Sequence, residues 1–470
     1  MEGSFKLSLS CDKIGESIPR SVLCYVRPWY SEQMRLLGSM AFPGSNVVSC
    51  SEHKSVDEVG LNVKYYAHLR GTLKQAGPLN PSVSTADAED MILRCRLLRK
   101  LPRSEAERHV YAMANAVSEI LANHKPEIVL SLTVDSYVID LMLHFCTLMG
   151  IRFIGLVPSF VNGYFRVTAR GERTINPQPD QSAVEAIRQK LVDPLYAPAF
   201  TAKAIAHPKL SVLKRWAGNA ARVPYFWAMR FLTRDPYNYH YWGSQLVSTD
   251  RLAFLPPKDL GWKDWEQVFD SDQRPPLYIP LQMLPEATVD YWCEDVSVTD
   301  YYNMLERLIM KHHETFQLLI KEHPNVMGYR PSDFYRKLRT DSRITVVPTY
   351  TPSNYVLDRV PAVLVWTGTV GYEAALRGKA VITLCDPYYA RGKRFLRITR
   401  ETDSAVLLSH VLTSSSTAVT REEQEDLLQF LIMQLFKGSF KNDGSWSSLN
   451  PTDVRDTERM ALSLRALASV

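Results

Sequence analysis

The stretch AVLVWTGTVGYEAALRGKAVITL, residues 362–384, indicates the fold most directly. It begins with an apolar run (362–366), passes through a turn rich in glycine and threonine, continues in a short helical segment (371–377) and ends in a second apolar run (380–384). Short apolar runs that alternate with helical segments are typical of strands in a parallel α/β sheet. The stretch therefore predicts a strand–helix–strand unit whose polar turn lies at the carboxyl end of its first strand.

The same alternation extends through both halves of the chain. Apolar runs predict further strands at 21–26, 128–132, 153–157, 277–281, 316–320 and 344–347. Helical patterns end the chain near 421–436 and 453–468. The rhythm fails between about 178 and 272. We therefore expect an α/β protein in three parts: a first α/β domain at 1–200, a basic aromatic helical linker at 201–274, and a second α/β domain with C-terminal helices at 275–470.

Composition narrows the class of protein. The 470 residues carry 55 basic and 50 acidic side chains, a net charge of +5, which is too mild to indicate nucleic acid but suits phosphates or an anionic membrane. Residues 1–21 lack the pattern of a signal peptide, and the chain has no apolar run long enough to span a bilayer. We expect a protein of the cytoplasm or of the inner face of the cytoplasmic membrane. The seven cysteines form no CxxC pair, which favours reduced thiols over disulfides or structural zinc.

The strongest motif is the turn at 367–379, between the two apolar runs. Thr367, Gly368, Thr369 and Gly371 place hydroxyls and backbone amides at the start of a helix, where the helix dipole favours an anion. Glu373 lies one turn further on, where a carboxylate can accept hydrogen bonds from ribose hydroxyls. The motif predicts a phosphate site with no metal, although a strand–helix turn without a ligand would have the same pattern.

A second motif, at 321–324, directly follows the strand predicted at 316–320. Pro324 ends the strand and presents His323 at its carboxyl end, where a histidine can bind a phosphate or give a proton to a leaving group. Lys321 and Arg330 add positive charge. After the strand at 277–281, Gln282 and Glu286 either contact the same ligand or cap the following turn.

In the N-terminal half, Asp135 follows the strand at 128–132. We consider it a candidate general base, and the alternative is a helix N-cap. A polar aromatic loop at 159–170 contains Asn162, Tyr164 and Arg166, which either bind an acceptor or only cross the surface.

The basic aromatic stretch at 209–234 favours either a membrane-surface element or a packed pair of helices. No pattern of metal ligands stands out: His312 and His313 are adjacent and point to different faces of a helix, and no Asp-x-Asp pair occurs near them. We expect no metal and no cofactor.

Three motifs together resemble a known family. The runs Pro-Leu-Gln-x-x-Pro-Glu-Ala at 280–287, Lys-Glu-His-Pro at 321–324 and Thr-Gly-Thr-Val-Gly-Tyr-Glu-Ala at 367–374 are similar to those of bacterial capsular polysaccharide biosynthesis proteins, a group that includes Kdo transferases. The His-Pro and Gly/Thr-Glu motifs also resemble those of bacterial polysialyltransferases. The resemblance covers about residues 275–390. It implies a GT-B-like architecture, in which two Rossmann-like domains face each other across a cleft.

The resemblance also implies roles. His323 is the histidine of the His-Pro motif, Thr367, Gly368 and Thr369 contact the donor phosphate, and Glu373 faces the ribose. The donor is a CMP-, UDP- or GDP-linked sugar, and the acceptor is lipid-linked or a polysaccharide. The polysialyltransferases carry their base in an acidic-acidic-glycine motif, which 133–135 lacks, so the resemblance does not extend to the base.

The expected activity is a metal-independent glycosyl transfer. Two alternatives remain open at this stage. The same scaffold hosts nucleotide-sugar 2-epimerases, which need more acidic and histidine side chains near the phosphate turn. A non-catalytic component of capsule assembly would dock through the basic aromatic stretch.

Overall fold

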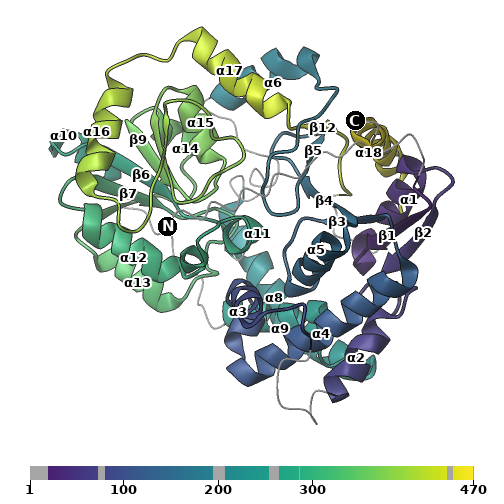
Figure 1. The fold of residues 1–470 in the computed structure, drawn as a ribbon. Helices are drawn as coiled ribbons and strands as arrows, with labels where there is room; N and C mark the ends of the chain where they lie inside the picture. Colours follow the sequence, from purple (N-terminus) through teal and green to yellow (C-terminus); the bar gives the residue numbers. More distant parts are fainter. Residues whose placement is uncertain are drawn as a thin grey trace.

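The computed structural model describes residues 19–71, 80–193, 207–252, 264–271, 273–284, 286–441 and 448–468. Its strands form two separate six-stranded sheets, each flanked by helices (Figure 1). This confirms the predicted α/β class, with two Rossmann-like halves in a GT-B-like arrangement. The N-terminal segment on which we predicted no signal peptide lies largely outside the described residues, as does the expected domain boundary between 200 and 201.

The first sheet has the order β12-β5-β4-β3-β1-β2. Its strands are β1 (Ser21–Tyr25), β2 (Asn46–Cys50), β3 (Ile128–Leu132), β4 (Arg152–Pro158), β5 (Tyr164–Val167) and β12 (Phe436–Lys437). The helices around it are α1 (Ser31–Ala41), α2 (Leu61–Gly71), α3 (Thr85–Arg94), α4 (Arg103–His124), α5 (Tyr137–Met149) and α18 (Pro451–Ala468). The four strands β2, β1, β3 and β4 are parallel, because helices connect them, whereas β5 is antiparallel to β4 and β12.

Strand β5 corrects one expectation, because we expected a loop over 159–170. Phe165 and Val167 face one apolar core, and Phe165 packs on Phe436 of β12 at 5.6 Å between ring centroids. Apolar residues at alternate positions bury one face of a strand. The polar residues between them made this short strand look like a loop.

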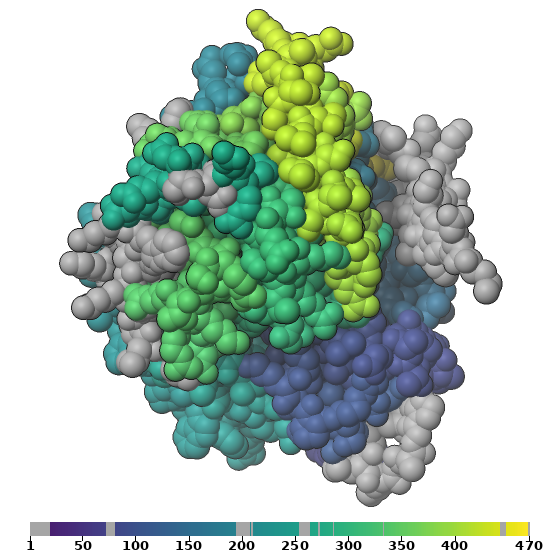
Figure 2. All heavy atoms as spheres, turned by 90° about the vertical axis from the view of Figure 1, so that its left-hand side faces the viewer, coloured from purple at the N-terminus to yellow at the C-terminus, as the bar shows by residue number. Residues whose placement is uncertain are grey.

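The second sheet is entirely parallel, in the order β11-β10-β9-β6-β7-β8. Its strands are β6 (Pro276–Pro280), β7 (Gln317–Lys321), β8 (Ile344–Val347), β9 (Ala362–Val365), β10 (Ala380–Thr383) and β11 (Phe395–Arg397). Its helices are α6 (Val184–Val192), α10 (Val268–Ser271), α11 (Ala287–Asp290), α12 (Tyr301–His312), α13 (Ser332–Thr340), α14 (Ser353–Leu357), α15 (Val370–Leu376), α16 (Ser404–Ser415) and α17 (Arg421–Ile432). In Figure 2 the segment of α16 and α17 (yellow-green) runs over one side of this half.

The chain crosses between the halves more than once, which differs from the expected division at 1–200 and 275–470. Helix α6 packs against α15 and α17, and its Ile187 and Leu191 join the core of the second half. Helix α18 returns to pack against α1, and β12 pairs with β5. The sequence of an amphipathic helix shows that one face is apolar and must be buried. It does not show which sheet that face packs against.

Two helices form the middle of the chain, α8 (Pro208–Leu232) and α9 (Tyr239–Leu252). They pack against each other, and Tyr239 and Trp242 join a core of the first half. The other face of α8 exposes Leu213, Trp216 and Trp227. The predicted packing of a helix pair is therefore confirmed for one face of the stretch, and the other face is exposed. Among the described helices, none is both long and apolar enough to cross a membrane.

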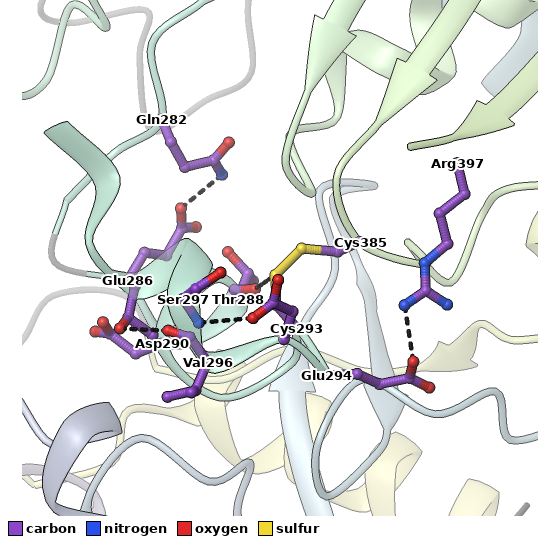
Figure 3. The surroundings of a disulfide bond; sticks show 12 residues. Gln282, Glu286, Thr288, Asp290, Cys293, Glu294, Val296, Ser297, Cys385 and Arg397 are labelled. Carbon is purple, nitrogen blue, oxygen red and sulfur yellow. Dashed lines mark hydrogen bonds and ion pairs between the residues drawn. A yellow bond between two sulfur atoms is a disulfide. The ribbon is translucent and has the colours of Figure 1, made fainter. Parts of the chain in front are cut away.

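A disulfide joins Cys293, just after α11, to Cys385, just after β10 (Figure 3). Our expectation of reduced thiols alone was wrong for this pair. The two cysteines lie 92 positions apart in sequence, and the fold brings their Cα atoms to 5.1 Å. Spacing along the chain cannot reveal such a pair, because only the tertiary arrangement decides it. Of the other cysteines in the described residues, all four are free and buried.

Candidate functional site

The glycine and threonine turn follows β9 and leads into α15. Among the described residues, the buried Thr367 hydroxyl has no hydrogen-bond partner, and Thr369, at the N-cap position, makes no side-chain cap. The Tyr389 hydroxyl donates to the Gly368 carbonyl and braces the turn. A Cβ on Gly371 would lie 2.9 Å from the Tyr389 hydroxyl, so this glycine serves close helix packing. The two threonine hydroxyls are therefore not used by the fold.

Glu373 lies behind the turn, where its side chain is buried with 4% of the residue exposed. Within the described part of the chain, no hydrogen bond or ion pair reaches its carboxylate. Burial raises the pKa of Glu373 from 4.5 to about 7, although Arg377 and Lys321 oppose the change. Lys321, at the end of β7, is equally buried, and burial lowers its pKa to about 8 against the pull of Glu322 and Glu373. Such buried, weakly compensated groups are typical of ligand sites.

His323 lies directly after β7, as predicted. Its Nδ1 accepts from the backbone N–H of Asn325 at 3.2 Å, which leaves the ring proton on Nε2. Burial, followed by the charges of Lys321, Arg330 and Arg215, lowers the pKa of His323 to about 3. The ring is therefore neutral at physiological pH, and it can donate a hydrogen bond from Nε2 but cannot act as a cation.

Arg330 lies near His323, as expected, and it is also part of a buried ion pair. Its Nε donates to Glu322 at 2.6 Å and its Nη2 to the carbonyl of Gln282 at 2.6 Å, and both ionic side chains are fully buried. The Tyr335 hydroxyl also donates to the Glu322 carboxylate at 3.0 Å. An ion pair buried in this way compensates its own charges. Arg330 thus holds the loops after β6 and β7 together, and its charge is already matched by Glu322.

Gln282 and Glu286 follow β6. Gln282 donates from its side-chain amide to Glu286 at 2.9 Å (Figure 3). Its Oε1 lies 3.2 Å from the position of a Cβ on Gly368, so the side chain lies against the phosphate turn. Burial raises the pKa of Glu286. Pro285, between them, lies outside the described residues. The structure thus brings the residues after β6, β7 and β9 together at one edge of the second sheet.

Asp135 follows β3 at the corresponding edge of the first sheet. Both of its oxygens accept from Arg27, at 2.5 and 2.7 Å. Burial alone would raise its pKa, but the charge and hydrogen bonds of Arg27, assisted by Arg96, hold the pKa below its usual value. The N-cap of α5 is Ser136, whose hydroxyl accepts from the N–H of Ile139, so Asp135 is not the cap. Asp135 is therefore held in its ionised form by a fixed partner.

The three residues of the expected acceptor loop are separated. Tyr164 donates to Asp180 at 2.6 Å, and Asn162 is exposed in the turn before β5. Arg166 is buried, with its guanidinium 3.4 Å from the ring centroid of Tyr388 in the second half, and burial lowers its pKa to about 10. Arg166 contacts Tyr388 of the opposite half, and Tyr164 packs against the apolar core of that half.

The two halves meet through the segment that follows α11. Trp292 donates from its ring nitrogen to the Thr133 hydroxyl at 3.1 Å, and Arg94 donates to the carbonyl of Cys293 at 2.8 Å. Thr133 lies at the carboxyl end of β3. The candidate base and the candidate donor residues therefore lie on the sides of the two sheets that meet at this junction.

Sequence reasoning missed Arg27 and Tyr389. A signal for Arg27 was present, since it follows β1, which neighbours β3 in the sheet, and the carboxyl ends of parallel strands meet at one edge. Tyr389 gave no such signal, because it reaches the turn through a loop after β10.

Comparisons with known proteins give one family match and several similar solved structures. Residues 243–392 match the model of a family described as capsule polysaccharide biosynthesis protein. A search of curated proteins gives no match. Among solved structures, the β-Kdo 2,7-transferase of Thermosulfurimonas dismutans KpsC is similar at 11% identity, over 90% of this chain and 94% of that one, with a TM-score of 0.35. The β-Kdo 2,4-transferase of the same KpsC is similar at 11% identity, over 70% and 86%, with a TM-score of 0.31.

A UDP-GlcNAc 2-epimerase from Methanocaldococcus jannaschii is similar at 10% identity, over 87% of this chain and 98% of that one, with a TM-score of 0.27. Structural similarities this weak do not distinguish a transferase from an epimerase. The family match is more specific, because it includes the loops after β6, β7 and β9 that carry all three motifs. Over residues 243–392, the chain is therefore similar to the capsule polysaccharide biosynthesis proteins.

Proposed function

We propose that this chain is a glycosyltransferase of capsule polysaccharide assembly, which transfers a sugar from a nucleotide-activated donor. The observation that carries the proposal is the pair of unused groups at the carboxyl edge of the second sheet. The Thr367 hydroxyl and the Glu373 carboxylate are buried there without a hydrogen-bond partner in the described residues. Buried polar groups without partners are costly unless a ligand completes them. A nucleotide offers a phosphate to the threonine and ribose hydroxyls to the carboxylate.

The donor residues would stabilise the departing nucleotide. The acceptor oxygen bonds to the anomeric carbon while the bond from that carbon to the phosphate oxygen breaks, and the nucleotide leaves with the electron pair. Lys321 contributes a cation to this site, and His323 contributes the hydrogen bond of its neutral Nε2–H. Fixed donors of this kind stabilise the charge that develops on the leaving phosphate. The proposed transfer needs no metal and no cofactor.

We assign the base to Asp135. Arg27 orients the carboxylate and keeps it ionised, so that it can take the proton of the acceptor hydroxyl. The low pKa makes Asp135 a weaker base, but it also keeps the carboxylate available at any pH above the acidic range. Within the same proposal, Arg166 lies on the acceptor side of the junction.

A thermal-shift panel of CMP, UDP and GDP on the full chain tests the donor site. A nucleotide that binds only the folded state raises the melting temperature, and Glu373→Gln should abolish that increase. The exposed Glu314 of the turn after α12 offers a matched control, since Glu314→Gln removes a carboxylate far from the motifs. If none of the nucleotides changes the wild-type melting curve, the donor site is refuted and a non-catalytic role gains support.

Reaction products separate the transferase from the epimerase. With the nucleotide that binds, the corresponding nucleotide sugar and a capsule acceptor, a transferase releases free nucleotide and lengthens the acceptor. A 2-epimerase converts the nucleotide sugar without an acceptor. Conversion of the sugar alone would overturn the proposed transfer.

We further propose that the exposed face of α8 binds the inner surface of an anionic membrane. This face carries Leu213, Trp216, Trp227 and Phe231, which are 41–61% exposed, beside the exposed Lys214. Aromatic side chains together with cations suit the headgroup region of a bilayer. Flotation with vesicles of phosphatidylglycerol should carry the wild type to the top of a gradient, and Trp216→Ser with Trp227→Ser should remain below. Equal flotation of both proteins would refute membrane binding by α8.

A further inference from the structure

Two arginines outside the three motifs, Arg215 and Arg251, meet on Tyr329 in the loop that carries His323, and the charges of Arg96 and Arg222 act on Arg251. Arg96 follows α3, Arg215 and Arg222 lie on α8, and Arg251 lies near the end of α9. The guanidinium carbons of Arg251 and Arg215 lie 4.1 and 5.7 Å from the ring centroid of Tyr329, in the loop after β7. Three separate segments thus bring cations to one place.

These cations have no carboxylate partner within ion-pair distance among the described residues. The Nε of Arg96 and the Nε and Nη2 of Arg215 are buried without any hydrogen-bond partner. The charges of Asp290, Asp135 and Glu286 interact with Arg96. Arg99 and Arg27 already pair with the two aspartates, and Glu286 accepts from Gln282. The cluster therefore differs from the compensated arginine pairs elsewhere in the protein.

The surroundings of Arg251 are unfavourable without a ligand. Burial lowers the pKa of Arg251, and the charges of Arg222, Arg96 and Arg215 lower it further, while Tyr329 opposes them. Like charges gathered in a partly buried place repel each other, and an oxyanion would relieve the repulsion and complete the unused N–H groups.

The contacts of Arg215 and Arg96 indicate which part of the substrate the arginines would bind. Arg215 donates from Nη1 to the carbonyl of Pro324 at 3.1 Å, next to His323, and Arg96 acts on the charge of Asp135. Arg215 thus lies next to the candidate leaving-group histidine, and the charge of Arg96 reaches the candidate base. The arginines come from α3, α8 and α9, on the side of the first half, and not from the turn at 367–373.

We propose that Arg96, Arg215 and Arg251 form an oxyanion subsite that binds a phosphate or carboxylate group of the acceptor. The inference rests on the proposed function, since the reaction supplies the acceptor. The subsite fixes the acceptor so that its hydroxyl reaches Asp135 while the donor occupies the opposite side. An acceptor without a negative charge near its reacting end would bind weakly.

Calorimetric titration of the full chain with inorganic phosphate tests the subsite. Arg251→Gln and Arg215→Gln should each weaken phosphate binding about tenfold or more, because each removes a charged hydrogen-bond donor. Arg251→Lys keeps the charge and should lose less phosphate affinity. This variant therefore separates the loss of a cation from a folding defect. Arg307→Gln, on the exposed side of α12, removes a cation elsewhere and should bind phosphate as the wild type does.

The titration is repeated in the presence of the nucleotide that raises the melting temperature. Unchanged phosphate affinity assigns the anion to the acceptor, as proposed, whereas competition assigns the arginines to the donor phosphate and overturns the acceptor subsite. Equal phosphate binding by the wild type and both glutamine variants refutes the subsite itself. Failure of the proposed function is distinct: phosphate then binds through the arginines, but no nucleotide changes the melting temperature.

Discussion

Replacing Glu373 by glutamine should make the protein more stable and at the same time remove its donor site. The carboxyl group ionises near pH 4.5 in an unfolded chain, and burial raises its pKa to about 7 in the fold. At about 1.4 kcal/mol per pKa unit, holding the ionised group in the fold costs about 3 kcal/mol once the pH exceeds both values. Glutamine does not ionise, so the variant avoids this cost.

Because burial raises the pKa of Glu373, its cost to the stability of the fold depends on pH. Below about pH 4.5 the group is protonated in both states and costs nothing, and stability is lost as the pH rises through 7. The gain from Glu373→Gln should therefore be about 2.5 kcal/mol larger at pH 8 than at pH 5. The loss of the attraction between Glu373 and Lys321 reduces this gain, because that attraction partly supports the pKa of the lysine.

Urea unfolding of the ligand-free chain at pH 5 and pH 8, followed by far-UV circular dichroism, measures the difference. The exposed Glu314→Gln variant should show no pH-dependent gain. A gain of equal size at the two pH values, or no gain at pH 8, would show that the Glu373 carboxyl is not held in a desolvated place, and would refute the proposed ribose site.

Three further predictions concern other parts of the molecule. Gly371→Ala should lower the free energy of unfolding by about 1–3 kcal/mol in urea, because its methyl group meets two atoms at 2.9 Å; an unchanged midpoint would mean that α15 can move off its strand. Replacing Cys293 and Cys385 by serine should cost about 4–5 kcal/mol by the entropy of the 92-residue loop, and a reductant should lower the wild-type melting temperature but not that of the double variant. Arg27→Met should raise the pKa of Asp135 and shift the acidic limb of the pH–rate profile upward; a profile in the wild-type position would remove Asp135 from the role of base.

The α/β class and the location of most strands follow from local patterns in the sequence. Apolar runs at 128–132 and 344–347 are the strands observed at those residues, since a strand buried on both faces needs a continuous apolar run. The sequence also placed Gln282, His323 and Thr367 correctly at the ends of strands, because turn residues after a buried run are a local signal.

Which charged side chains are left to bind a ligand depends on the tertiary structure. Lys321 and Arg330 are both cations near the same motif, yet Glu322 compensates Arg330 whereas Lys321 remains beside an unpaired carboxylate. Likewise, Arg215 looked like part of a surface stretch and proved to face the junction. Charge compensation depends on which groups lie within a few ångströms of each other, and residues from α3, α8 and α9 become neighbours only when the whole chain has folded.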